Sequence, residues 1–337
     1  ELWQNKGRTI QVVLIIAMGA FAIGMIIGSS QLIRAGMTAV WRNSNPAMIN
    51  FSVDPAVDED IIRALEGIRG VADVEGFSET TIEWRANLGD EWQPAGLLAR
   101  EDYRDQVYTK FSRVSGEWPH GDTFAIGQGA DQVFGLQPGG QLYLRINDRQ
   151  HQITIGGTIY NPIAQPPGFG GTPQFYTSQD RFRELTTESG FNRILAGAAR
   201  FDEEQVTELA NEMEDRLEKL GIESSEAFLG RVSDPNEHFF QQTLDGIFLV
   251  LGILAAVALI LGLLLVYNTM SAVVTQQMDQ IGIMKAIGAE TRDIIRIFFT
   301  IVFIYGVLAL LIAIPLGALG ANALSRFLMG AFNAEPA

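Results

Sequence analysis

The chain has 337 residues, enough for a membrane-embedded part beside a sizeable soluble part. Apolar residues make up 47% of it, and 39 acidic against 24 basic residues give a formal net charge of −15. Cysteine is absent from the sequence, which excludes disulfides and cysteine-based metal or redox sites.

Three long stretches contain no Asp, Glu, Lys, Arg or His: residues 9–33, 246–278 and 297–325. Each exceeds the roughly 20 helical residues that cross a bilayer core, so we expect three membrane-spanning helices. The first stretch lacks a small-residue cleavage pattern and is longer than a signal-peptide core. We therefore interpret it as a retained helix.

The charges are divided as sharply as the apolar residues. Residues 46–245 carry a net charge of −18, whereas the rest of the chain carries +3. This predicts a soluble acidic domain between the first and second spans and disfavours nucleic acid as its partner.

The basic residues that flank the spans are Lys6, Arg8, Lys285, Arg292 and Arg296 on one side, and Arg34, Arg42 and Arg326 on the other. By the positive-inside rule the N-terminus and the loop 279–296 are cytoplasmic, and the acidic domain and the tail 326–337 face the periplasm or exterior.

The acidic domain begins and ends with strand–helix–strand patterns. We predict a strand at 50–53, a helix at 54–69 that ends at Gly70, and strands at 71–77, 81–85 and 95–99. Near the end of the domain we predict a strand at 194–201 and a helix at 202–220 that stops at Gly221. The two patterns can pair into one α+β lobe.

Between these patterns, residues 111–176 are rich in Gly and Pro and lack helical periodicity. Alternating runs at 141–146 and 150–155, separated by Asn147-Asp148, predict a β-hairpin. We therefore expect a β-rich insertion, followed by a long loop at 160–173.

The second span changes character toward its end, where Asn268, Thr269 and Ser271 precede Gln276 and Gln277. We expect this helix to continue past the bilayer into the cytoplasm, where a rigid helix can transmit motion between the outer domain and the inner loop. The alternative is a frayed helix end in a polar loop. Pro315 lies inside the third span, where neighbouring helices can satisfy the freed carbonyl.

The cytoplasmic loop has the pattern of a docking element. Gly282 and Gly288 bracket the apolar residues Ile283, Met284 and Ile287. Gly288 and Ala289 can end one short helix, and residues 290–297 can begin the next. A short apolar and basic helix at a turn suits insertion into a partner's groove. The alternative is an amphipathic helix lying on the membrane surface.

The same loop carries a family resemblance. The residues concerned are Met278-Asp279-Gln280-Ile281-Gly282-Ile283-Met284-Lys285-Ala286-Ile287-Gly288-Ala289, followed by Arg292-Asp293-Ile294-Ile295. This segment resembles the cytoplasmic signature of FtsX/MacB-like ABC transporter permeases. The entry to the first span, Asn5-Lys6-Gly7-Arg8-Thr9, is also similar to that family. The sequence departs from the family in two places. Position 280 is Gln where the family usually has Glu, so an ion pair from that acid to the ATPase is not expected here. The family's fourth span does not occur before Ala337, so we expect the chain to continue.

The resemblance implies an α-helical membrane protein with a large α+β extracytoplasmic domain. Its expected parts are an N-terminus and first span (1–33), the outer domain (34–245), the second span with its extension (246–278), a coupling loop (279–296), the third span (297–325) and an outer tail (326–337). Within the outer domain it implies a porter-like lobe (46–110 and 191–235) and a sabre-like β-rich insertion (111–190). The residues it assigns to ATPase coupling are Gln280, Ile281, Gly282, Ile283, Met284, Lys285, Ala286, Ile287, Gly288, Ala289 and Glu290.

The resemblance also implies a mechanism and partners. A separate ABC ATPase subunit, with ATP and Mg on that subunit, acts on the loop of this non-catalytic chain, which itself has no cofactor. Further implied partners are a second permease copy or homologous half, the lipid bilayer and a periplasmic adaptor. The implied location is the bacterial inner membrane.

Other patterns carry no site in our interpretation. Gly168-Phe169-Gly170-Gly171 lacks the Lys-Ser or Lys-Thr of a phosphate loop, and we interpret it as an outer loop. His120, His151 and His238 lack metal-ligand spacing. The acidic face of 202–220 is interpreted as a solvated face, with a surface for a cationic partner as the alternative.

Three functions compete. The favoured one is a permease that exports or extracts an amphiphile, such as a lipid, lipoprotein, peptide or drug. The first alternative is a signalling module that activates a cell-wall hydrolase without moving a substrate. The second is an unrelated membrane-tethered receptor or enzyme, which would co-purify with no ATPase.

Overall fold

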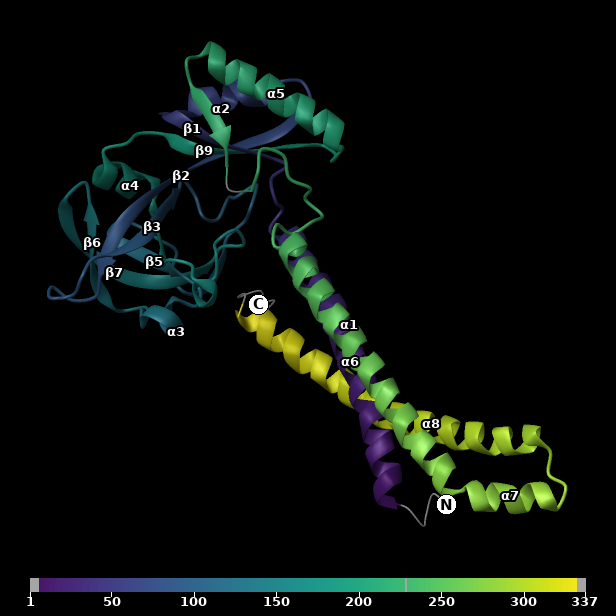
Figure 1. The fold of residues 1–337 in the computed structure, drawn as a ribbon. Coiled ribbons are helices and arrows are strands. Elements are labelled where there is room, and N and C mark those ends of the chain that lie inside the picture. The colour runs from purple at the N-terminus through teal and green to yellow at the C-terminus, as the bar shows by residue number, and fades with distance from the viewer. Residues whose placement is uncertain (1–5, 228, 332–337) are drawn as a thin grey trace. The chain divides into compact units, whose positions relative to one another are not determined.

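The computed structural model describes residues 6–227 and 229–331, and Figure 1 shows their helices and strands. The chain divides into two compact units. The helical unit comprises residues 1–35 and 240–328, and the α+β unit comprises residues 36–239 and 329–337.

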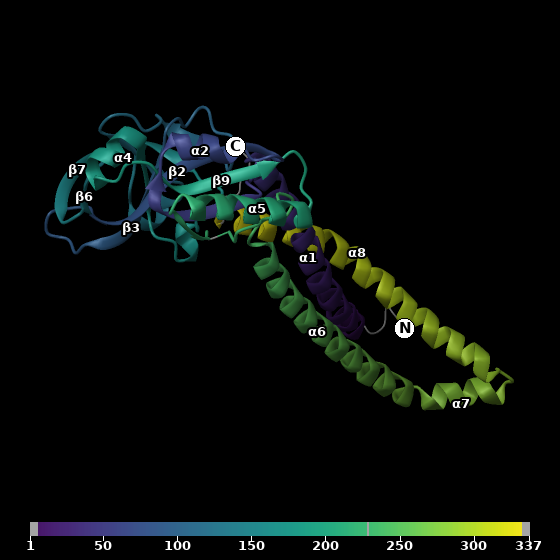
Figure 2. The ribbon, with the colours of Figure 1, turned by 90° about the horizontal axis from the view of Figure 1, so that it is seen from above.

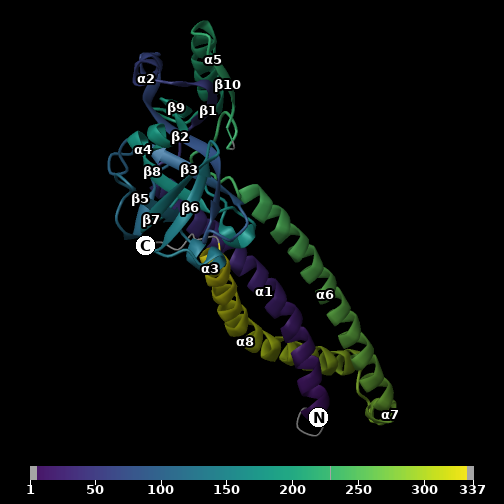
Figure 3. The ribbon, with the colours of Figure 1, turned by 90° about the vertical axis from the view of Figure 1, so that its left-hand side faces the viewer.

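Three long helices dominate the helical unit: α1 (Lys6–Asn43), α6 (Gln241–Gln276) and α8 (Thr291–Ala331). Each contains a stretch that is long and apolar enough to cross a membrane, and these stretches are Thr9–Asn43, Thr243–Gln276 and Thr291–Gly330. The three predicted spans are therefore present as helices. In two perpendicular views, α1 lies between α6 and α8 (Figures 2 and 3).

Small residues allow α1 to approach its two neighbours closely. A Cβ at Gly19 would lie 3.0 Å from Cδ1 of Leu259 in α6, and one at Gly28 would lie 2.9 Å from Cβ of Ala321 in α8. On α8 the buried alanines Ala309, Ala313 and Ala321 follow one another at multiples of four residues. Close backbone approach through small residues is the usual way in which helices pack without a hydrophobic driving force.

The α+β unit contains a βαββαβ lobe. Its elements are β1 (Ile49–Val57), α2 (Glu59–Glu66), β2 (Val71–Arg85), β9 (Phe191–Ala198), α5 (Glu203–Lys219) and β10 (Glu223–Glu226). The strand order is β10-β1-β9-β2, with every pair antiparallel, which is the ferredoxin-like arrangement. Both helices lie on the same face of this sheet (Figure 1). The predicted pairing of the two strand–helix–strand patterns is therefore confirmed.

Local sequence signals explain both helices of this lobe. The carboxylate of Asp202 accepts from the Gln205 N–H at 3.1 Å and caps α5, whose apolar face is buried as far as Leu217. In α2 the cap is Asp58, which accepts from the Ile61 N–H at 3.1 Å. The helix thus begins five residues later than the predicted start at Asp54, because residues 54–57 continue β1 and the residue before Pro55 disfavours helix.

The insertion between β2 and β9 builds a closed ring of strands. Its elements are β3 (Gln93–Arg100), β4 (Ser112–Gly116), β5 (Thr123–Gly127), α3 (Ala130–Phe134), β6 (Gln141–Ile146), β7 (Arg149–Tyr160), η1 (Pro167–Phe169), β8 (Gln174–Ser178) and α4 (Gln179–Thr186). Pairing runs β2-β3-β8-β5-β7-β6 and back to β2, with β4 outside the ring on β7. Leu97, Phe124, Leu144 and Phe175 are almost fully buried and fill the ring as a core.

The prediction of the β6–β7 hairpin was right, whereas the prediction of two strands in place of β2 was wrong. The hairpin is as predicted, with Asn147 and Asp148 at φ values of 48° and 58°, as a type I′ turn requires. The two strands predicted at 71–77 and 81–85 are a single strand, β2. Its first half belongs to the ferredoxin-like lobe and its second half to the ring, so the ring includes strands from the region 46–110.

His238 is buried next to the last turn of α1. Its ring centroid lies 5.0 Å from that of Trp41 and 4.7 Å from that of Phe239. This burial lowers the pKa of His238 to about 4. A histidine whose pKa is depressed on folding contributes stability above its unfolded pKa of about 6.5, and this contribution is lost as the pH falls toward 4.

We therefore expect His238→Phe to flatten the pH dependence of thermal unfolding between pH 6.5 and 4. The measurement compares unfolding midpoints of the full chain in detergent across this range. Carboxylates titrate in the wild type and in His238→Phe alike, so only the difference between the two unfolding curves reports on His238. His120 is 65% exposed in its side chain and provides the matched control, because His120→Phe should leave the wild-type slope in place. Equal slopes for wild type and His238→Phe would contradict the expectation.

Candidate functional site

The predicted coupling residues occupy one helix and the turn that follows it. Helix α7 (Met278–Ala286) contains residues 280–286, Ile287 caps it, and residues 288–290 lead into α8. The short helix expected at this place is present, and it begins two residues before Gln280. The structure therefore brings all the predicted residues together in one element between α6 and α8 (Figure 1).

A single residue separates α7 from α6. The N–H of Gln277 donates to the carbonyls of Val273 at 3.2 Å and Val274 at 3.1 Å, and its φ of −102° departs from the helix. The N–H of Ile281 then donates to the Gln277 carbonyl at 2.9 Å and starts α7. Because the break is this short, α7 is attached directly to the end of a 36-residue helix.

Gly288 closes α7 with a Schellman motif. Its φ is +101°, and its N–H donates to the Lys285 carbonyl at 3.1 Å. The N–H of Ala289 donates to the Met284 carbonyl at 3.0 Å. These two bonds satisfy carbonyls at the helix end, and the left-handed conformation that they require suits glycine. The predicted helix stop at Gly288-Ala289 therefore has a defined geometry.

Helix α7 presents its apolar side chains outward. None of its residues is buried; Ile283 is 64% exposed and Ile287 is 81% exposed. Gly282 has open space around the position of a Cβ, so packing within the described chain does not require a glycine there. Ile283 and Ile287 are therefore apolar side chains that no part of the described chain covers.

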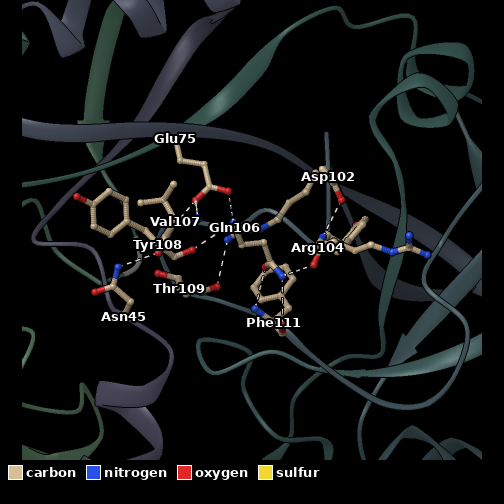
Figure 4. Close-up of polar contacts among 11 residues, drawn as sticks. Asn45, Glu75, Asp102, Arg104, Gln106, Val107, Tyr108, Thr109 and Phe111 are labelled. Atoms are coloured by element: carbon tan, nitrogen blue, oxygen red, sulfur yellow. Dashed lines mark hydrogen bonds and ion pairs between the residues drawn. The ribbon is translucent and has the colours of Figure 1, made fainter.

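A second polar arrangement lies in the α+β unit, where residues 101–111 form a strap after β3. The carboxylate of Glu75 accepts from the N–H groups of Val107 at 3.1 Å and Tyr108 at 2.8 Å (Figure 4). The guanidinium of Arg100 donates to the carbonyls of Tyr108 and Thr109, each at 3.2 Å. The backbone of the strap is thus held by an acid on one side and a base on the other.

Glu75 and Arg100 also contact each other. The Oε1 atom of Glu75 and the Nη1 atom of Arg100 are 2.7 Å apart, and the two side chains are 15% and 1% exposed, respectively. The Arg100 guanidinium stacks 4.3 Å from the ring centroid of Phe111. Burial lowers the pKa of Arg100, whereas the Glu75 carboxylate acts in the opposite direction. The pair is a buried, hydrogen-bonded ion pair whose partners depend on each other.

The strap also holds the end of α1. The Thr109 N–H donates to the Asn45 carbonyl at 2.9 Å, and the Lys110 N–H donates to the Ser44 carbonyl at 2.7 Å. The side chain of Asn45 donates to the Val107 carbonyl at 2.8 Å (Figure 4). The residues that follow α1 are therefore bonded to a segment that β2 and β3 hold in place.

Sequence reasoning did not identify the strap. Its bonds join residues from three distant stretches of the chain, and no local periodicity marks such contacts. One signal was available, because Arg100 directly follows the apolar run Leu97-Leu98-Ala99 at the end of a predicted strand. A charge in that position needs a partner when it is buried.

The other patterns from the sequence form no site in the described residues. Across 6–227 and 229–331, no group of three or more His, Cys, Asp or Glu residues is arranged to hold a metal ion. Residues 168–171 lie at the short turn η1 and the bend after it, not between a strand and a helix.

The described chain thus combines three helices that are long and apolar enough to cross a membrane, a large α+β unit, and an exposed helix–turn between the second and third of these helices. Residues 252–336 match the family model of the FtsX-like permease C-terminal domain. This match confirms the resemblance to FtsX-like permeases that was found in the sequence. The matched segment includes α7 and all the predicted coupling residues.

Three solved structures are similar to part of the chain. One is the extracellular domain of the noncanonic ABC-type transporter YknZ from Gram-positive bacteria, with 13% identity, a TM-score of 0.37, and coverage of 53% of this chain and 99% of that one. Another is the periplasmic region of MacB from Actinobacillus actinomycetemcomitans, with 9% identity, a TM-score of 0.37, and coverage of 53% and 89%. The third is a domain of a putative permease protein from Porphyromonas gingivalis, with 17% identity, a TM-score of 0.32, and coverage of 58% and 94%. A search of curated proteins finds no match.

Proposed function

We propose that this chain is the membrane subunit of an ABC transporter that exports or extracts an amphiphilic substrate. In this proposal a separate ATPase, carrying ATP and Mg, docks on α7 and residues 287–290 in the cytoplasm. The chain itself performs no catalysis and works with a second permease copy or half in the bacterial inner membrane. The observation that carries the proposal is the exposed helix α7, closed by Gly288 within the family-matched segment.

Two features support transmission from this site to the outer domain. Helix α7 follows α6 after a single non-helical residue, so a displacement of α7 is passed to a helix of 36 residues. Within the α+β unit, the strap is bonded to Ser44 and Asn45 and also to Glu75 in β2 and Arg100 in β3. Movement of the end of α1 is therefore passed to the ferredoxin-like lobe and to the ring. A lipid, lipoprotein, peptide or drug is the proposed class of substrate.

Replacing both Ile283 and Ile287 with serine is expected to weaken association with the ATPase by more than tenfold, because exposed apolar anchors dominate the affinity of an interface. Both side chains are largely exposed, so the stability of the chain should not change. The measurement is ATPase binding to the full chain in nanodiscs. Leu88, which is 60% exposed in the β2–β3 loop, gives the matched control Leu88→Ser. Unchanged affinity in the double variant would contradict docking at α7.

The signalling alternative uses the same docking site but moves no substrate. The two functions are separated by measuring ATP-dependent release of a fluorescent amphiphile from proteoliposomes that contain both subunits. Release supports the transporter. ATP-dependent movement of the outer domain without release supports a regulator of a cell-wall hydrolase.

A further inference from the structure

The first turns of α8 carry an unusual exposed face. Arg292, Arg296, Phe299 and Phe303 follow at spacings of four, three and four residues, which places them on one side of a helix. Phe299 and Phe303 are each 72% exposed, and both arginines are exposed as well. Ile294, on the opposite side, is 7% exposed. The stripe of four residues therefore faces away from the rest of the helical unit.

The charges of the stripe have no counterpart within the described chain. No carboxylate among the described residues lies within 4.0 Å of the guanidinium of Arg292 or Arg296 to form an ion pair. The acids in this region, Asp279, Glu290 and Asp293, thus leave both guanidinium groups available. Two adjacent arginines that lack an acid are suited to bind an anion with oxygen acceptors, which guanidinium groups can bind in a bidentate manner.

The charge pattern of α8 indicates where a bilayer would meet this stripe. At 1.5 Å per residue, its 41 residues are more than the roughly 30 Å thickness of a bilayer core requires. The uncharged part begins at Ile297. If this part lies in the bilayer core, Arg292 and Arg296 lie at headgroup depth, and Phe299 and Phe303 lie one to two turns deeper, at the level of the acyl chains.

We infer that this stripe binds an anionic phospholipid of the cytoplasmic leaflet. The arginines contact the phosphate, and the phenylalanines contact the first part of the acyl chains. A lipid fits the whole stripe because it combines an anionic group and an apolar chain in the same order. A cytosolic ATPase reaches the arginines but not the phenylalanines. The inference rests on the membrane placement of α8 and not on ATP coupling.

The test uses the full chain in phosphatidylcholine nanodiscs with a photoactivatable probe, either phosphatidylglycerol or phosphatidylcholine. Cross-linking to residues 292–303 is expected to favour the anionic probe by about thirtyfold, which corresponds to two basic groups near an anionic lipid. The Arg292→Gln/Arg296→Gln variant should lose this preference. The control Arg42→Gln/Arg326→Gln removes the same charge from the opposite end of the helices and should retain it.

Each remaining outcome has a defined meaning. Equal labelling by both probes, an unchanged preference in the Arg292→Gln/Arg296→Gln variant, or loss of preference in the control would overturn the inference. So would a second copy of the chain or the ATPase cross-linking to residues 292–303 in place of lipid. The Arg292→Lys/Arg296→Lys variant retains the charge, and partial retention of the preference supports contact through guanidinium groups. Thermal unfolding equal to wild type verifies that the variants are folded.

Discussion

Arg100→Met is expected to destabilise the α+β unit by about 3 kcal/mol, the lower end of the range for breaking a buried ion pair. The substitution keeps apolar volume beside Phe111 but leaves the Glu75 carboxylate buried without its cation. It also leaves the carbonyls of Tyr108 and Thr109 without the donors that they have in the wild type. The strap then loses the bonds that hold its carbonyls.

The measurement is urea unfolding of the full chain, combined with hydrogen exchange of the amides of residues 107–110. Exchange of these amides should accelerate in Arg100→Met before global unfolding. Arg63→Met is the matched control, because Arg63 is 66% exposed beside Glu59 and Asp60 and its loss should cost at most about 1 kcal/mol. Adding Glu75→Gln to Arg100→Met should restore part of the lost stability, since the unpaired charge is removed. A double variant that is as unstable as the sum of the single ones would contradict a coupled pair.

The second large effect is expected at Gly288. Gly288→Val places a β-branched residue at a φ of +101°, which costs at least 1–3 kcal/mol of local strain and opens the turn after α7. Because the surroundings of Gly288 are open, the strain arises from the backbone and not from a clash. We expect the ATP-dependent change in the outer domain to be smaller by about tenfold or more, while the partner still hydrolyses ATP.

Gly282→Ala tests whether coupling needs a glycine within α7 or only the turn at Gly288. A Cβ at Gly282 meets no atom within 4 Å, and alanine stabilises a helix by about 1 kcal/mol relative to glycine. Retained coupling in Gly282→Ala means that only the turn at Gly288 matters. Lost coupling, with the helix intact, means that the ATPase approaches the backbone of α7 at Gly282. Full coupling in Gly288→Val would contradict the role of the turn. Coupling is measured as the ATP-dependent change in fluorescence of a probe on a single cysteine at position 88, which is unique because the natural chain has none.

Local patterns predicted much of the fold. Runs without charge identified the three long apolar helices, and the helix predicted at 202–220 with its stop at Gly221 corresponds to α5. The pair Asn147-Asp148 defined the β6–β7 hairpin. These predictions are correct because each depends on residues that are close in sequence. Helix α7 was likewise predicted from a local signal, since Gly288 marks its end.

The closed ring and the strap could not be predicted in this way. Closure requires β6 to pair with both β2 and β7, and the pairing of β2 with β6 joins residues about 60 apart in the chain. Likewise, Glu75 binds backbone groups more than 30 residues away. Pairing over such distances depends on the assembled core, and the alternation within one strand does not identify its partner. The start of α2 was predicted too early for a simpler reason, because the acids of 54–60 belong partly to a strand and partly to a cap.

Hydrogen exchange of the full chain with its ATPase, with and without ATP, can establish whether the turn after α7 drives the outer domain. Binding of the ATPase should protect the amides of α7 and residues 287–290, and ATP should then change the exchange of the strap at residues 101–111. The second change should disappear in Gly288→Val while the global stability remains. If α7 stays unprotected, or if the strap responds to ATP equally in wild type and Gly288→Val, the cytoplasmic turn does not drive the outer domain.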